Sequence, residues 1–118
     1  MKFYLLVDDV FFSTRIKDVV RAANFECESI KKIEDVAKIA VDDIVFIDLA
    51  FKKFSYIEAI KTMNPDAQKI GFAHHMETEA IEAAKQAGAE EVLPRSQFVE
   101  MLPRIIKSIR EAESESAS

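Results

Sequence analysis

Three aspartates follow two apolar segments of the chain, and these are the residues best suited to bind a metal ion or to react. Asp8 and Asp9 end the apolar run from Phe3 to Val7, and Asp48 stands inside IVFIDLAF, residues 44–51. An apolar run without alternation is typical of a strand that is buried on both faces of a parallel sheet. The carboxyl ends of such strands meet at one edge, where open α/β sheets bind ligands. We therefore expect the three carboxylates to converge.

Converging carboxylates favour a metal ion. Three of them at close range repel, and without a counter-charge one would tend to hold a proton. Mg²⁺ accepts one or two carboxylates, a backbone carbonyl and waters, and leaves positions for phosphate oxygens. Beside the metal, an ionised Asp48 could attack a phosphoryl group, and Arg95, the basic residue at a predicted strand end, would take the remaining charge. Alternatively, these acids only terminate turns and cap helices.

The elements that must position these residues alternate along the chain. The apolar spacing predicts strands over residues 3–7, 25–29, 44–48, 69–73 and 91–93, and helices over 12–23, 33–40, 55–63, 77–87 and 96–109. This (βα)5 pattern predicts an α/β fold, a doubly wound parallel five-stranded sheet with right-handed crossovers.

Residues at the predicted helix ends support these boundaries. Asn24 and Gly88 follow two of the helices, where a left-handed residue commonly ends a helix. Ser55 and Ser96 precede two others as candidate N-caps. Pro103 falls inside the last helix, and we expect a kink or restart there.

Composition limits the class of protein. With 118 residues, 49% of them apolar, the chain fits one domain, predicted over residues 1–111, followed by a disordered acidic tail at 112–118. The net charge of −5 argues against non-specific nucleic-acid binding. No apolar run is long enough to span a bilayer and no signal peptide is evident, so we expect a cytoplasmic protein without membrane contact. The single cysteine, Cys27, is predicted to be a core thiol.

Histidine and aromatic pairs need separate consideration. His74 and His75 follow the fourth strand, and neighbours in a strand point to opposite faces, so we expect one at the crevice rim and one exposed. Phe11 and Phe12 are expected to make a core contact at a helix start. The aromatic cluster after Asp48, at residues 51–56, suits either a partner surface or the core.

Residues 1–111 resemble the receiver domain of bacterial two-component response regulators. The resemblance rests on VDD after the first strand, IVFIDLAF around a lone acid, and AAKQAGAEEVL leading into the last strand. It implies a flavodoxin-like receiver fold with Asp48 as phospho-acceptor. It also implies that Asp9, Asp48 and the carbonyl of Ala50 bind Mg²⁺ directly, with Asp8 binding through water. A sensor histidine kinase, a phosphotransfer protein or a small phosphodonor would supply the phosphoryl group, and a downstream protein would receive the signal.

Four positions near the acids depart from the receiver pattern or need their own interpretation. Ala73 stands where receivers carry a Thr or Ser that bonds the phosphoryl group, and Val92 stands at the aromatic switch position. Arg95 replaces a lysine and keeps its charge with a larger, planar group. His74 matches the position that controls access to the acceptor, so it could contact a phosphoryl group.

Two functions therefore compete. The first is a stand-alone atypical receiver in a phosphorelay, which is not an enzyme and signals through protein contacts. The second is a pseudo-receiver, an interaction module that works without phosphorylation. An α/β phosphohydrolase is less favoured, because such enzymes carry a second acid two residues after the nucleophile and this chain has Ala50 there.

Overall fold

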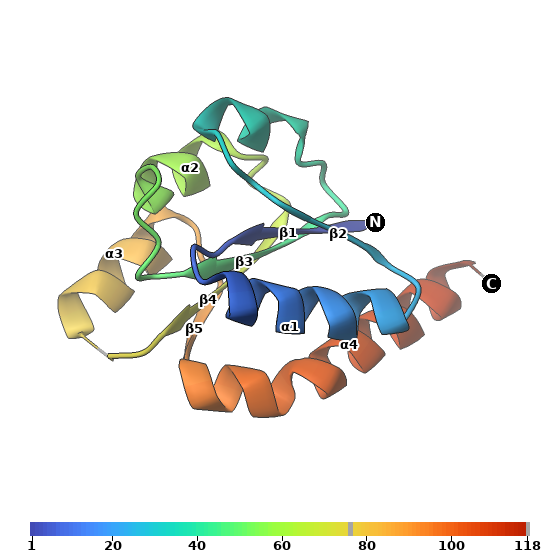
Figure 1. The fold of residues 1–118 in the computed structure, drawn as a ribbon. Coiled ribbons are helices and arrows are strands. Elements are labelled where there is room, and N and C mark those ends of the chain that lie inside the picture. Colours follow the sequence, from blue (N-terminus) through green and yellow to red (C-terminus); the bar gives the residue numbers. More distant parts are fainter. Residues whose placement is uncertain (76, 118) are drawn as a thin grey trace.

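The computed structural model describes residues 1–75 and 77–117. One parallel sheet has the strand order β2-β1-β3-β4-β5 (Figure 1). The strands are β1 (Lys2–Leu6), β2 (Glu26–Ser29), β3 (Ile44–Asp48), β4 (Gln68–Ala73) and β5 (Glu91–Pro94). The helices are α1 (Val10–Ala22), the 3-10 helix η1 (Ile33–Lys38), α2 (Tyr56–Thr62), α3 (Thr78–Ala87) and α4 (Arg95–Ala117). The predicted doubly wound (βα)5 fold is confirmed.

Helices cover both faces of the sheet. Helices α1 and α4 lie on one face, and η1, α2 and α3 lie on the other (Figure 1). All residues of β3 are buried, with Phe46 in the core on the α1 and α4 side and Val45 and Ile47 in the core on the opposite side. This alternation is what a strand with two buried faces requires, and it explains why the IVFID run has no polar alternation.

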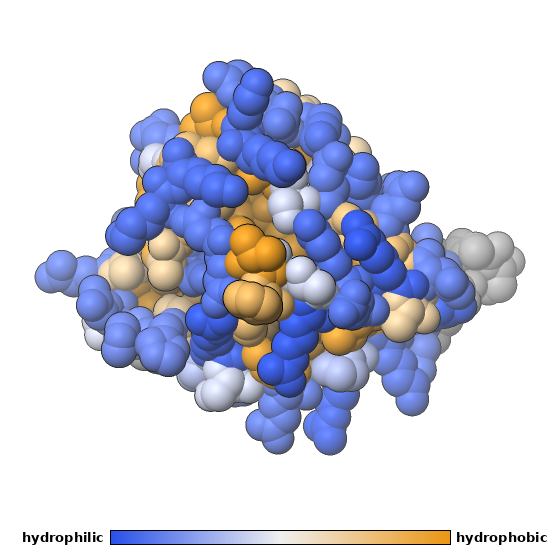
Figure 2. Space-filling model, in the orientation of Figure 1, coloured by the Kyte–Doolittle hydropathy of each residue, from blue (hydrophilic) through white to orange (hydrophobic). Residues whose placement is uncertain are grey.

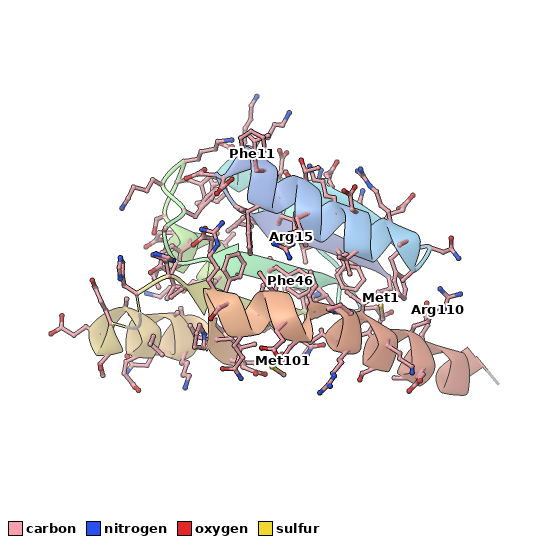
Figure 3. All side chains as sticks on the ribbon, turned by 60° about the horizontal axis from the view of Figure 1, so that its bottom comes forward. Met1, Phe11, Arg15, Phe46, Met101 and Arg110 are labelled. Atoms are coloured by element: carbon pink, nitrogen blue, oxygen red, sulfur yellow. The ribbon has the colours of Figure 1, made fainter. Side chains whose placement is uncertain are left out.

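An aromatic cluster ties the α1 and α4 face together. Phe98 of α4 is fully buried and stacks on Phe72 of β4 with ring centroids 4.5 Å apart. Its ring meets Phe46 edge to face at 5.1 Å, and Figure 3 shows Phe46 between the ribbons of α1 and α4. Phe12 of α1 joins the cluster 5.1 Å from Phe72. The carboxyl ends of the central strands are thereby held rigidly against two helices.

Several predicted helix ends are confirmed. The Ser55 hydroxyl accepts a hydrogen bond from the Glu58 N–H at 3.1 Å, as an N-cap does. Asn24 has φ 67° and Gly88 has φ 136°, both in the left-handed region.

Cys27 is buried and burial raises the pKa of its thiol to about 11, so the prediction of a core thiol holds.

Two predictions about local structure are wrong. The segment predicted as a helix over 33–40 is only a six-residue 3-10 helix. Val36 is its one buried residue, and a short turn is enough to bury a single side chain. The last helix begins at Arg95, so Ser96 lies in its first turn and is not the predicted cap. Of the kink or restart expected at Pro103, the structure shows no restart, and the axis of α4 bends along its length (Figure 1). Pro103 is exposed while Leu102 and Ile106 are buried, so packing on the sheet holds the helix across the proline.

The last helix extends into the segment for which the sequence predicts a disordered tail. The structure is helical as far as Ala117, beyond the boundary predicted at residue 111, and Ser118 lies outside the described residues. Extending an existing helix adds one hydrogen bond per residue without a new nucleus, and Ala and Glu are good helix formers. Among the described residues, we find no helix with the length and hydropathy needed to cross a membrane.

Candidate functional site

The carboxyl ends of β1, β3 and β5 bring the predicted charged residues together. Asp8 and Asp9 follow β1, Asp48 ends β3, and Arg95 follows β5. Arg95 Nη2 donates a hydrogen bond to Asp9 Oδ2 at 3.1 Å although 86 positions separate the two residues. The charges of Asp8 and Asp9 both raise the pKa of Asp48, as expected for neighbouring carboxylates. The expected convergence of acids and arginine at one edge is therefore present.

Asp48 is the most buried of the three acids. Asp48 is 7% exposed, and its Oδ1 accepts a hydrogen bond from the Ala50 N–H at 2.9 Å. Burial raises the pKa of Asp48, and the charges of Asp8 and Asp9 add to this rise. The Ala50 N–H and the Arg95 charge oppose it. The charged form of Asp48 is thus penalised, and a further cation at this edge would relieve the penalty.

Asp9 is exposed, and both of its oxygens already have partners. Oδ1 caps α1 by accepting the Phe12 N–H at 3.0 Å, and Oδ2 accepts from Arg95. The Phe12 N–H and then the Arg95 hydrogen bond lower the pKa of Asp9. The pKa of Asp9 is therefore lowered, whereas that of Asp48 is raised.

Asp8 shows the clearest gap in hydrogen bonding. Oδ2 accepts the Lys52 N–H at 2.7 Å, whereas Oδ1 is buried without a hydrogen-bond partner among the described residues. A buried carboxylate oxygen without a partner is costly, and such atoms commonly face a water or an ion. This oxygen fits the Mg²⁺ arrangement in which Asp8 contributes through water.

The side chains do not form a ready three-ligand cage. Within residues 1–75 and 77–113, no group of three or more His, Cys, Asp or Glu side chains is arranged to hold a metal ion. Mg²⁺ does not need such a cage, because it commonly uses one or two carboxylates and retains several waters. The residues present fit that sparser mode, with Asp9, Asp48 and the Ala50 carbonyl as candidate direct ligands.

Arg95 is held in place by an aromatic ring as well as by Asp9. Its guanidinium carbon lies 3.9 Å from the centroid of the Phe12 ring, a cation–π contact. Phe12 in turn packs on Phe72 and Phe98. The sequence analysis missed this role of Phe12, and no local signal would have revealed it, because the two residues belong to opposite ends of the chain.

The positions that depart from the receiver pattern lie near the same edge. Ala73 ends β4 and is 3% exposed. Because its side chain is a methyl group, it offers no hydroxyl to the site. Val92 is buried in β5 and has no ring to rotate. His74 and His75 are both exposed, and their rings meet edge to face at 4.8 Å. The prediction that they point to opposite faces is wrong, because β4 ends at Ala73 and the chain bends there.

The aromatic residues near the site divide between core and surface. Phe51 is buried and its ring meets Phe54 at 4.8 Å, so the aromatic cluster after Asp48 packs into the core. Phe12 is buried as predicted, but Phe11 is 89% exposed and projects from the start of α1 (Figure 3). Figure 2 shows a small apolar patch on this face within a largely hydrophilic surface, and Val10 is also 71% exposed.

Comparison with known proteins was informative only at the level of structure. No protein-family description matches the chain, and no curated protein sequence matches it. Solved structures do match over nearly the full length. A CheY-like response regulator receiver domain protein from Methanospirillum hungatei superimposes with a TM-score of 0.76 at 16% identity, covering 97% of each chain. The chain has the receiver fold.

Two further receiver-fold structures agree. The BeF3-activated DrrB receiver domain matches with a TM-score of 0.75 at 17% identity, over 93% of this chain and 97% of that one. A response regulator protein from Burkholderia pseudomallei, solved with a phosphorylated aspartic acid, matches with a TM-score of 0.71 at 16% identity, over 99% of this chain and 74% of that one. At such identities the likeness shows the fold, and function must be argued from the site.

Proposed function

We propose that this chain is an atypical response-regulator receiver that accepts a phosphoryl group on Asp48 with Mg²⁺ and signals through protein contacts. The observation that carries the proposal is the pair formed by a buried, destabilised Asp48 carboxylate and the buried Oδ1 of Asp8, which has no hydrogen-bond partner in the described part of the chain. Structural acids in turns and caps would be expected to have their oxygens paired or solvated. These two instead belong to an anionic edge whose charge Arg95 balances only in part.

The chain's own groups can be assigned roles in the transfer. Asp48 Oδ1 is held by the Ala50 N–H, so Oδ2 is the oxygen free to attack phosphorus. The new bond joins Oδ2 to phosphorus, and the bond from phosphorus to the donor breaks, with its electron pair leaving on the donor. Asp9, Asp48 and the Ala50 carbonyl would hold Mg²⁺, with Asp8 through water. When bound, Mg²⁺ neutralises the carboxylates and the phosphoryl oxygens. The donor would be a sensor histidine kinase, a phosphotransfer protein or a small phosphodonor.

The response to phosphorylation would differ from the pattern of typical receivers. Ala73 and Val92 offer neither a hydroxyl nor a rotating ring, whereas Arg95 begins α4 and already contacts Asp9 and Phe12. A phosphoryl group on Asp48 adds negative charge that competes with Asp9 for the Arg95 guanidinium. Movement of Arg95 off the Phe12 ring would alter the start of α4, which is where a protein partner would sense the change.

The second candidate is a pseudo-receiver that uses the same fold as a phosphorylation-independent interaction module. The Arg95–Asp9 ion pair favours it, because the arginine supplies part of the counter-charge that the acids need without any metal. Ala73 also favours it, because its side chain offers no hydroxyl to a phosphoryl group.

Intact mass measurement separates the two candidates. The wild type is incubated with Mg²⁺ and acetyl phosphate beside Asp48→Asn, with Asp66→Asn as an exposed aspartate control. We expect one phosphoryl adduct on the wild type and on the control, none on Asp48→Asn, and none when EDTA is present. If neither acetyl phosphate nor a sensor histidine kinase modifies the wild type while Mg²⁺ binds, the pseudo-receiver replaces our proposal.

A further inference from the structure

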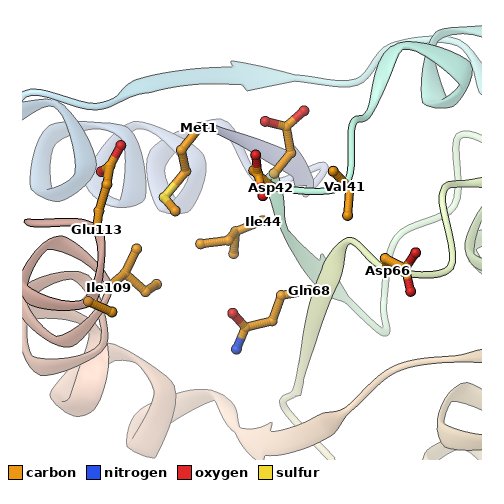
Figure 4. Close-up of a pocket in the computed structure, with 10 residues that line it drawn as sticks. Met1, Val41, Asp42, Ile44, Asp66, Gln68, Ile109 and Glu113 are labelled. Atoms are coloured by element: carbon orange, nitrogen blue, oxygen red, sulfur yellow. The ribbon is translucent and has the colours of Figure 1, made fainter. Parts of the chain in front are cut away.

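A cavity lies at the opposite edge of the sheet from the acidic site. Its volume is about 410 Å³, and it opens where β3 begins at Ile44 and β4 begins at Gln68 (Figure 4). Asp48 stands at the other end of β3, roughly 13 Å away at about 3.3 Å per residue. The cavity is therefore separate from the proposed phosphorylation site, and a ligand here would not touch the carboxylates of that site.

The inner wall of the cavity is apolar. Ile44 comes from β3 and Ile109 from the last turns of α4, while Met1 and Val41 complete the wall. Met1 is 44% exposed and Val41 is 50% exposed, and they are among the few large apolar side chains left open to solvent in the described part of the chain. An apolar group that entered the cavity would cover both, which is favourable because it removes apolar surface from water.

The rim of the cavity is acidic. Asp42, Asp66 and Glu113 line it, all three are exposed, and within the described residues none of them forms an ion pair. Asp43 also lines it, but its two oxygens accept the backbone N–H groups of Lys2 and Ala40 at 2.9 and 2.7 Å, so its role is structural. No Lys, Arg or His side chain belongs to the lining among the described residues, and the three exposed carboxylates outnumber the one α-ammonium group of Met1.

We propose that this cavity binds a small organic cation with an apolar body. The apolar wall and acidic rim are complementary to an ammonium group on an alkyl or aromatic body, whereas an anion of the same shape would be repelled. The volume falls in the range of about 300–1,000 Å³ that is typical of small-molecule sites. Because Ile44 and Asp48 share β3, such a ligand would reach one end of the strand whose other end carries the proposed acceptor.

A titration of the full chain tests the proposal. Octylammonium, kept below the concentration at which it forms micelles, is added to isotope-labelled protein and followed by two-dimensional NMR, with octanoate as the anion of matched length. We expect saturable shifts centred on the amides of Ile44, Gln68 and Ile109 with octylammonium and none there with octanoate. Absence of saturable shifts, or equal binding of octanoate, would overturn the proposal.

Variants of the rim test the charge complementarity. The triple variant Asp42→Asn, Asp66→Asn, Glu113→Gln should weaken octylammonium binding by about tenfold, since exposed ion pairs are individually modest. Val41→Ser removes part of the apolar wall and leaves the charge of the rim unchanged. It should weaken octylammonium binding by a smaller factor. All four positions are exposed, so we expect these variants to keep the fold.

A matched triple variant removes the same net charge elsewhere. Asp18→Asn, Glu82→Gln, Glu100→Gln changes three exposed acids on α1, α3 and α4 that do not line the cavity. It should bind octylammonium as the wild type does. If it weakens binding as much as the rim variant, the effect is one of overall charge and the site is not the cavity we propose.

Discussion

Replacing Arg95 with glutamine should tighten Mg²⁺ binding to the acidic edge. Arg95 Nη2 lies 3.1 Å from Asp9 Oδ2, and the two side chains are 30% and 42% exposed. The free energy of an ion pair that is this exposed to solvent is small. A metal that uses Asp9 must weaken this pair, so its removal returns that free energy to metal binding. The expected gain in affinity is therefore about 1.4- to 5-fold.

The same substitution should make the metal-free protein less stable. Arg95 covers the Phe12 ring at 3.9 Å, and a cation–π contact at a partly exposed position is worth about 0.5–1 kcal/mol. Glutamine lacks the charge and also loses the ion pair with Asp9, so the free energy of unfolding in EDTA should fall by at least this amount. Metal affinity and stability thus move in opposite directions, a combination that general damage to the fold would not produce.

Isothermal titration calorimetry with Mg²⁺ provides the assay. Arg104→Gln is the matched control, because it removes one positive charge from an exposed position further along α4. Arg95→Lys should fall between the wild type and Arg95→Gln, since lysine keeps the charge but not the planar fork. Equal or weaker Mg²⁺ binding by Arg95→Gln would refute the competition between Arg95 and the metal. If Arg104→Gln tightens Mg²⁺ binding by the same factor, the effect comes from the net charge of the protein and not from the Arg95–Asp9 pair.

Three further predictions concern stability. Burial raises the pKa of Asp48, so the folded state holds a proton more tightly than the unfolded chain and stability falls as pH rises through that window. In EDTA at pH 7, Asp48→Asn should therefore be more stable to urea than the wild type, with an advantage that shrinks toward acidic pH. A constant advantage at all pH values would contradict this. Phe98→Ala should lower the free energy of unfolding by about 3–5 kcal/mol because its ring is fully buried, while Phe11→Ala, at an 89% exposed position, should change it by less than about 0.5 kcal/mol in urea melts. Comparable losses for the two would show that our description of the aromatic core is wrong. Gly88→Ala should cost about 1–3 kcal/mol in thermal unfolding, because φ is 136° and a Cβ would lie 3.1 Å from Ile60 Cγ2. A variant that melts with the wild type would disprove the strain.

Much of the fold follows from local patterns that a reader of the sequence can recognise. The apolar run at residues 44–48 predicts a strand buried on both faces because hydrophobic periodicity is a property of neighbouring residues. Ser55 and Asn24 mark helix ends because their hydrogen bonds and backbone angles involve residues within a few positions. Because β3 ends at Asp48, this residue lies at the edge of the sheet where the carboxyl ends of the strands meet.

Other local expectations failed where packing outweighed propensity. Pro103 should interrupt a helix, yet buried Leu102 and Ile106 hold α4 on the sheet on either side of it. His74 and His75 should alternate in a strand, but β4 ends one residue earlier, so the rings come together. Strand and helix boundaries depend on where the sheet stops pairing, and that is decided by partner strands distant in sequence.

The sequence by itself determined the alternation of strands and helices and placed three carboxylates at one edge, because each depends on residues close together along the chain. Only the tertiary structure decided that Arg95 pairs with Asp9 over the Phe12 ring and that Asp8 retains an unpartnered oxygen. It alone also brought Met1 and Ile109 into one cavity. Such contacts join segments many residues apart, and their geometry depends on how the whole core packs, which no short stretch of sequence contains.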